Sequence, residues 1–398
     1  MLQNLWVAIC FVAFCSGSAV AANPGPERPT EIANLPGQNN QSHNSLNWLQ
    51  EWLSGPLPGQ PSSARIERYS APDYVPPAPI QRPITRQYLP PTPSPSSAPP
   101  SLAAEPAPVF AIPGLHLGVG VVATTGKTDW NHDASNASAL LGNPSSELIY
   151  EEVSTMALEF TGFIPLKDNY FVRGNFGVGV AFGGDGNFRD DDFLAGQVLF
   201  SSTDSAIPDT DLMYITIDAG KKILEAPDGS FSLSAFAGYQ FWRETYEAFG
   251  LLNRLTGQES QPNSVAVIKN VVEWNSFRLG AIASYKPDER TDWILDFALV
   301  PYTAMHNEDS HLLRTASTSL GPAPNVIMDG TGYGFEGSVG VNYLITLNLS
   351  AVVDLRYWLL MSDGEITTRA RTTTPSTFIL NDLDTVRYGA NIGLRYTF

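Results

Sequence analysis

The sequence predicts an all-β protein, a ten-stranded antiparallel transmembrane β-barrel that follows a disordered, proline-rich N-terminal extension. An apolar N-terminal segment typical of an export signal is the first observation behind this prediction. The second is that no later stretch reaches the ~18 apolar residues of a transmembrane helix. The third is a long C-terminal part in which apolar and polar residues alternate, as strands between lipid and a polar lumen require. A net charge of -17 argues against nucleic acid as a partner, because nucleic-acid-binding proteins concentrate positive charge.

Residues 1–21 are predicted to form a cleaved signal peptide. A run of apolar residues precedes the A-x-A site Ala19–Ala21, although no Lys or Arg stands before it, and an uncleaved anchor is the alternative. Both cysteines, Cys10 and Cys15, lie in this segment. The mature chain is therefore expected to have neither a disulfide nor a cysteine thiolate for catalysis.

Residues 22–113 are predicted to form a proline-rich periplasmic linker. Of the 31 prolines, 21 lie between Pro24 and Pro113. Because proline fixes φ and removes a backbone donor, this composition favours polyproline II and builds no packed core. Contact with the cell wall or an envelope partner is one expectation for this segment, and a passive tether is the other.

Residues 114–398 are predicted to form the barrel. In the last strand, apolar residues from Val386 to the terminal Phe398 alternate with polar or small ones. A soluble antiparallel sandwich would also alternate, but the export signal and the terminal aromatic residue favour a barrel that closes in the outer membrane. Ten strands are expected near residues 115–124, 147–163, 169–182, 210–224, 230–246, 264–286, 291–305, 331–345, 346–361 and 384–398. Five long segments are expected outside the cell, with some strands extending above the membrane as a rim: 125–146, 183–209, 247–263, 306–330 and 362–383.

Two of these outer segments carry acids in a spacing that suits the activation of a water molecule. Asp190 and Asp192 in one segment, and Asp309 and His311 in the other, are two residues apart. Residues two apart share a face of a strand, so the segments could set two carboxylates opposite an Asp-oriented imidazole. Such a set can activate water without a covalent nucleophile, because the histidine accepts a proton and two close carboxylates share one.

Other interpretations of the acidic segments remain open. The acids could be ordinary solvated surface, or Asp185 and Asn187 could join Asp190 and Asp192 in a calcium site. The segment lacks the residue order of a helix–loop–helix calcium loop. Neither a Gly-x-Ser-x-Gly elbow nor a His-Glu-x-x-His helix is present, which disfavours serine and zinc hydrolases of those types.

From about Leu115 to Phe398, the chain resembles the omptin family of ten-stranded outer-membrane endoproteases. The matching motifs are Gly126-Lys127-Thr128, Asp190-x-Asp192, Pro208-Asp209-Thr210-x-Leu212-x-Tyr214, Ala237-Gly238-Tyr239-Gln240, Asp309-x-His311 and Gly393-Leu394-Arg395-Tyr396-Thr397-Phe398. The resemblance implies an aspartic-type endopeptidase in the bacterial outer membrane, with its active site facing outside and a peptide or protein as its substrate. A non-catalytic barrel that serves as an adhesin or structural anchor is the alternative, because fold does not settle function.

The resemblance also implies roles for individual residues. Asp309 and His311 would form the dyad that activates water, and Asp190 and Asp192 the opposing carboxylate pair. Family members that cut beside basic residues line the substrate-binding pocket with two acids. In this chain, the nearest positions hold Trp130 and Asn307. A neutral Asn loses a Coulomb attraction worth about 4 kcal/mol at an effective dielectric near 20, so a preference for basic peptides is expected to carry over only if Asp129 or Glu308 substitutes for the missing acid.

No metal or cofactor is expected, but the resemblance implies that lipopolysaccharide activates the enzyme from the barrel's outer wall. Tyr239 and Arg243 match the family's Tyr-x-Glu-x-Arg motif, and Lys286 stands at a further basic position. Phe241 replaces the glutamate of the motif. The lipid site is therefore expected in an altered form.

Overall fold

The computed structural model describes residues 112–398, except 182–185, 316–319 and 370–375. The predicted signal peptide and almost all of the predicted proline-rich linker lie outside the described residues. No described helix is long and apolar enough to cross a membrane.

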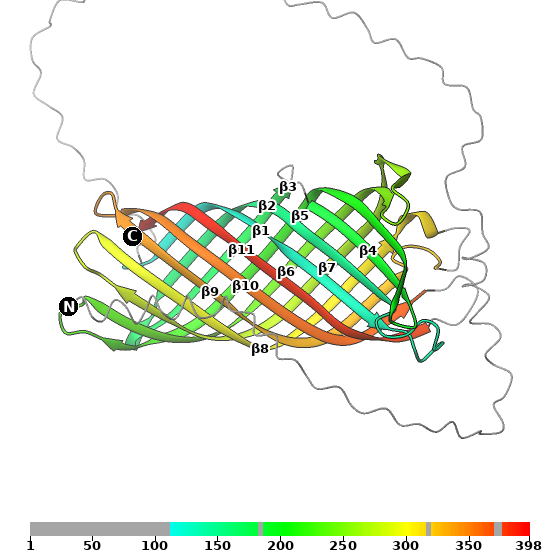
Figure 1. Ribbon diagram of the computed structural model, residues 1–398. Coiled ribbons are helices and arrows are strands. Elements are labelled where there is room, and N and C mark those ends of the chain that lie inside the picture. Colours follow the sequence, from blue (N-terminus) through cyan, green and yellow to red (C-terminus); the bar gives the residue numbers. More distant parts are fainter. Residues whose placement is uncertain (1–111, 182–185, 316–319, 370–375) are drawn as a thin grey trace, which may run out of the picture. The chain divides into compact units, whose positions relative to one another are not determined.

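The described residues form one antiparallel sheet that closes into a ring (Figure 1), because β1 pairs with both β2 and β11. The strands are β1 (His116–Asp133), β2 (Ser146–Pro165), β3 (Tyr170–Ala181), β4 (Gly186–Leu194), β5 (Val198–Glu225), β6 (Phe231–Asn253), β7 (Gln258–Tyr285), β8 (Thr291–His311), β9 (Val326–Leu344), β10 (Leu349–Thr368) and β11 (Ser376–Thr397). Two short 3-10 helices are also described, η1 (Lys167–Asn169) and η2 (Leu312–Arg314).

Strands β3 and β4 together occupy one position in the wall of the barrel. β3 pairs with the second half of β2, from Thr155 to Pro165, whereas β4 pairs with its first half, from Ser146 to Glu151. Both also pair with β5 on their other side. The eleven described strands therefore make ten wall positions, which confirms the predicted ten-stranded transmembrane barrel.

The two ends of the barrel differ in their connections. We call the end that carries Phe398 and the connections 166–169, 226–230, 286–290 and 345–348 the turn end, and the opposite end the loop end. At the loop end, strands continue into the five segments that the sequence places outside the cell, as the expected rim requires, and they extend beyond the predicted strand bounds. β6 and β7, for example, stay paired up to Asn253 and Gln258, within residues 247–263. Above the membrane both faces of a strand can be polar, so alternation fades from the sequence while backbone pairing continues.

An apolar band with aromatic borders surrounds the barrel. On the border of the band that faces the loop end, Tyr239, Phe277 and Tyr302 are register partners on β6, β7 and β8, and all three side chains are exposed. Near the turn end, Tyr285 and Trp293 are exposed register partners. Phe277 and Tyr285 are eight residues apart on β7, or ~27 Å along a tilted strand, which fits an outward apolar band ~25 Å tall.

Inside the barrel, an aromatic layer separates two polar regions. The rings of Tyr214 and Trp358 each lie 5.3 Å from that of Trp242, and all three side chains are buried. Gly177 leaves room for Tyr214, because a Cβ at that position would collide with its ring. The layer forms the upper boundary of a polar lumen at the turn end and lies below the acids of the loop end.

Candidate active site

Strand β4 fixes Asp190 and Asp192 on the inner face of the barrel wall. β4 is paired with β2 on one side and β5 on the other, and Phe188 on the same face contacts Tyr150 inside the barrel, with the ring centroids 4.7 Å apart. Asp192 accepts a hydrogen bond from the hydroxyl of Ser146, its register partner on β2. Asp190 has a buried Oδ1 that no described residue reaches with a hydrogen bond.

The end of β8 holds Asp309 and His311. Asp309 is fully buried, and neither carboxylate oxygen accepts a hydrogen bond from a described residue. The Nε2 atom of His311 lies 3.5 Å from Asp309 Oδ2, and its side chain keeps 14% of its surface exposed. An imidazole that touches a buried carboxylate and still reaches solvent can take a proton from water.

The two acid pairs act on one another across the interior. Burial raises the pKa of Asp190 well above its ordinary value, and the charges of Asp192 and Asp309 raise it further. Burial also raises the pKa of Asp192, which the hydrogen bond from Ser146 and the charges of Arg314 and His311 oppose. Two close carboxylates with raised pKa values share a proton, because both cannot ionise at low cost. The structure thus gathers all four predicted catalytic residues in one site.

Three residues at the site were not singled out from the sequence. Arg314 lies on η2, and its charge acts on Asp190 and Asp192, while burial lowers its own pKa. Buried Asn325 fixes the backbone of His311, accepting from its N–H at 2.9 Å and donating to its carbonyl at 3.2 Å. Arg314 comes three residues after His311 in the sequence, and Asn325 comes fourteen residues after His311. Neither spacing signals in the sequence that the residue belongs to this site.

Tyr150 is the third such residue. It is fully buried, and its ring stacks on that of Tyr246 at 4.9 Å. Burial raises the pKa of Tyr150 well above its ordinary value, and the charges of Asp309 and Asp190 add to this effect. The phenol therefore stays protonated beside the acids, where its hydroxyl has no partner among the described residues.

The predicted substrate-binding residues lie in different surroundings. Asn307 shares the inner face of β8 with Asp309, is fully buried, and has no hydrogen-bond partner for either amide atom among the described residues. Trp130 is also buried, in the apolar cluster of the interior, with its ring 6.0 Å from that of His132. The structure thus places Asn307 beside the dyad, whereas no described contact joins Trp130 to it.

The structure does not gather the three predicted lipopolysaccharide-binding residues. Tyr239 and Arg243 lie on the outer face of β6, where Arg243 Nη1 is 3.4 Å from a carboxylate oxygen of Glu273. Lys286 lies instead in the connection between β7 and β8, at the turn end, thirteen residues beyond Glu273. The sequence motif could not predict this separation of Lys286 from Tyr239 and Arg243. It does not give the height at which a residue lies along the barrel axis, because the strands are tilted.

Comparisons with known proteins support the fold. No protein-family model and no curated protein matches the sequence. Among solved structures, the chain is similar to the outer membrane protease OmpT from Escherichia coli, with a TM-score of 0.59 and 16% identity over 74% of this chain and 99% of that chain. OprG from Pseudomonas aeruginosa matches with a TM-score of 0.32 and 10% identity, over 72% of this chain and 96% of that chain. The likeness to OmpT confirms the barrel fold that the omptin resemblance implies.

Proposed function

We propose that this chain is an endopeptidase of the bacterial outer membrane that hydrolyses peptide bonds with an activated water. The observation that carries the proposal is the convergence of the Asp190–Asp192 and Asp309–His311 pairs at the loop end, with carboxylate oxygens left unpaired. These pairs come from well-separated wall positions of the ring. The shared fold with an outer membrane protease supports the same conclusion. The loop end would face outside the cell.

In this mechanism, water is held between the two pairs. His311 takes a proton from the water as the water oxygen attacks the peptide carbonyl carbon, and Asp309 orients the imidazole and stabilises the imidazolium that forms. The imidazolium returns the proton to the leaving nitrogen when the C–N bond breaks, which yields a free amine and a carboxylic acid. Asp190 and Asp192 share one proton and hold the attacking water by hydrogen bonds. General acid–base catalysis of this kind contributes ~10²–10⁴-fold to the rate. No metal and no covalent intermediate takes part.

The substrate is a peptide or protein that lies across the loop end. Because Asn307 is neutral and buried beside the dyad, a basic side chain gains no ion pair from that position. Lipopolysaccharide is the proposed activating lipid, bound on the outer wall near Tyr239 and Arg243 without Lys286. Arg243 would have to exchange Glu273 for a lipid phosphate.

The test uses the full chain, refolded in detergent with and without lipopolysaccharide and incubated with a mixed peptide library analysed by mass spectrometry. Cleavage should be lost in Asp309→Asn and His311→Ala. His306→Ala is the matched control, because this histidine lies on the same strand but is exposed and paired with Asp329. The control should cleave like the parent.

Unchanged cleavage in both dyad variants would rule out the mechanism. If the folded parent cleaves nothing under any lipid condition, the alternative is favoured, a non-catalytic barrel that acts as an adhesin or structural anchor.

A further inference from the structure

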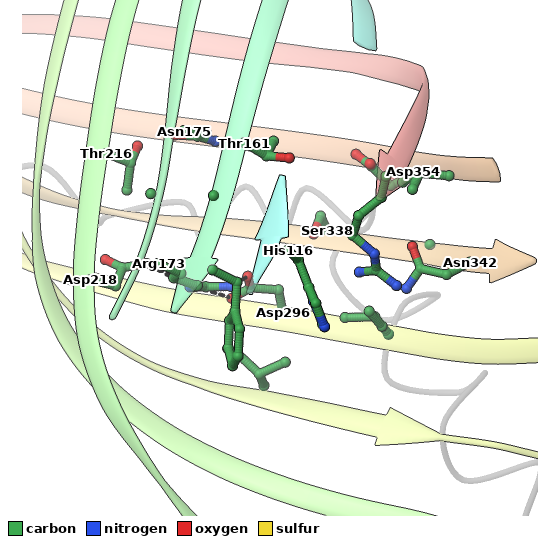
Figure 2. A pocket seen from close by; sticks show the side chains of 18 of the residues that line it. His116, Thr161, Arg173, Asn175, Thr216, Asp218, Asp296, Ser338, Asn342 and Asp354 are labelled. Carbon is green, nitrogen blue, oxygen red and sulfur yellow. Dashed lines mark hydrogen bonds and ion pairs between the residues drawn. The ribbon is translucent and has the colours of Figure 1, made fainter. Parts of the chain in front are cut away.

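A second site lies in the lumen at the turn end. It is a cavity of about 590 Å³ between the aromatic layer and the turns, lined by charged and polar side chains of most of the strands (Figure 2). Small-molecule sites have volumes of ~300–1,000 Å³, so the cavity is large enough for a ligand. Tyr214 and Trp358 of the aromatic layer bound it, which separates it from the proposed active site.

The deep wall of the cavity carries more acids than bases. Three arginines are each paired with two carboxylates: Arg173 with Asp218 and Asp296, Arg278 with Asp218 and Glu336, and Arg356 with Glu159 and Asp354. Five carboxylates against three guanidinium groups leave a formal charge of -2. This part of the cavity therefore favours a cation.

The mouth of the cavity has the opposite balance. Arg395 on β11 and Lys286 in the connection between β7 and β8 both line it, and no ion pair of the described residues includes either of them. The charges of both act on the ring of His116, which also lines the cavity. Asp292 is the acid whose charge acts on Arg395, and it already accepts a hydrogen bond from the hydroxyl of Ser284. Two bases and one acid leave a formal charge of +1.

Arg395 keeps hydrogen-bonding capacity for a ligand. Its Nε is buried and has no partner among the described residues. Guanidinium is a planar donor that matches a carboxylate in a two-bond geometry. By contrast, Lys222, which also lines the cavity, already contacts Glu225 at 2.9 Å.

We propose that this cavity binds a short peptide with free termini, its carboxylate on Arg395 at the mouth and its ammonium group towards the deep acids. The charges of the cavity change sign from mouth to depth, as those of an extended zwitterion do. Apolar lining residues such as Phe163, Ile282 and Val341 leave room for uncharged side chains.

The spacing of the charges sets the length of the peptide. Ser350, the register partner of Arg395, is four residues from Asp354 on β10, or ~13 Å along the strand. An extended peptide spans ~3.3–3.6 Å per residue, so three or four residues bridge the two ends. A phosphate dianion fits less well, because the mouth supplies one net positive charge.

The first experiment is isothermal titration calorimetry on the full chain, refolded in detergent. The probes are trialanine, trialanine with an acetylated amino group, trialanine with an amidated carboxyl group, and inorganic phosphate. Trialanine should bind, and each blocked form should bind at least 10-fold more weakly. Absence of trialanine binding, equal binding of the blocked forms, or tighter binding of phosphate would overturn the proposal.

Variants test the position of the site. Arg395→Gln should weaken trialanine binding at least 10-fold, whereas Lys222→Gln should stay within about twofold because this lysine is already paired. Heat-dependent gel mobility reports whether each barrel is folded. If Arg395→Gln does not fold, Lys286→Gln, in an exposed turn, should still weaken binding severalfold. Unchanged binding in the folded variants would place the peptide elsewhere.

Discussion

The acids at the loop end and those in the turn-end lumen have the same chemistry but different partners. In the lumen, Asp218 contacts both Arg173 and Arg278, and its side chain is almost fully buried. At the loop end, Asp309 is as deeply buried, yet neither of its oxygens accepts a hydrogen bond from a described residue. Asp190 also has a buried, unpaired oxygen.

The difference indicates which cluster is structural and which is chemical. A buried carboxylate that is paired with guanidinium groups holds the wall together, so removing it is expected to cost stability. A buried carboxylate without such pairs has a raised proton affinity and free acceptor positions, which are common properties of catalytic groups. Substitutions in the two regions should therefore affect different measurements.

The largest expected effect is on cleavage by Asp190→Asn. The substitution removes the shared proton of the acid pair, so kcat/KM should fall ~10²–10⁴-fold. The free energy of unfolding should not fall, because the ionised form of this buried acid is disfavoured in the folded state. Cleavage kinetics and urea unfolding measure the two quantities. A variant that cleaves normally but unfolds more easily would contradict the assignment.

The reverse pattern is expected for Asp218→Asn in the lumen. The change breaks the ion pairs of Asp218 with Arg173 and Arg278, although each arginine keeps one other carboxylate, and the loss of these charged hydrogen bonds should cost about 1.5–3 kcal/mol. Urea unfolding should show the loss, while cleavage per folded molecule stays near that of the parent. Glu289→Gln, in the exposed β7–β8 connection, is the control and should leave stability unchanged. Equal stability of both variants would show that the lumen pairs are not structural.

A smaller effect is expected when an acid is added to the loop end. Asn307→Asp places a carboxylate on the face of Asp309, where it can attract a basic substrate side chain. The Coulomb attraction, reduced by the cost of desolvating the two charges, should increase the preference for arginine-containing over neutral peptides about 10- to 100-fold. This corresponds to ~1.4–2.7 kcal/mol. The ratio of kcat/KM for two peptides that differ at one residue measures it. No change in that ratio would remove Asn307 from the substrate site.

The smallest effect concerns Asp384, an acid on the outer part of β11. Burial raises its pKa to about 6, and the nearby charges of Asp129 and Asp382 contribute. Because the folded state binds this proton more tightly than the unfolded state, the stabilisation is present below pH ~4 and is lost as the pH rises to about 6. In Asp384→Asn, the free energy of unfolding should not show this decrease between pH 4 and pH 6. The decrease in the parent is expected to be about 1 kcal/mol or less, because solvent screens the half-buried carboxylate. Urea unfolding at pH 4, 5 and 7 tests this prediction, and parallel curves for variant and parent would contradict it.

The barrel, and the shared face of each residue pair at the loop end, could be predicted from the two-residue period of strands, whereas the assignment of the two pairs to one site came from the resemblance to the omptin family. Asp190 and Asp192 share a face for the same reason that apolar residues of β11 do. The contacts of Arg314, Asn325 and Tyr150 with this site could not be predicted, since they depend on how a short helix and a loop close over it and on the register of β2 against β4. The place of Lys286 depends on strand tilt and register, which the residue pattern does not reveal.

The aromatic layer has a consequence for ion transport. Tyr214, Trp242 and Trp358 fill the lumen between its two polar regions, and Tyr246 and Arg387 above them are fully buried. A hydrated ion that entered from the turn end would meet stacked rings instead of a water column. In a planar bilayer under voltage, the folded protein should therefore show no unitary conductance, and Trp242→Ala is the substitution most suited to creating one.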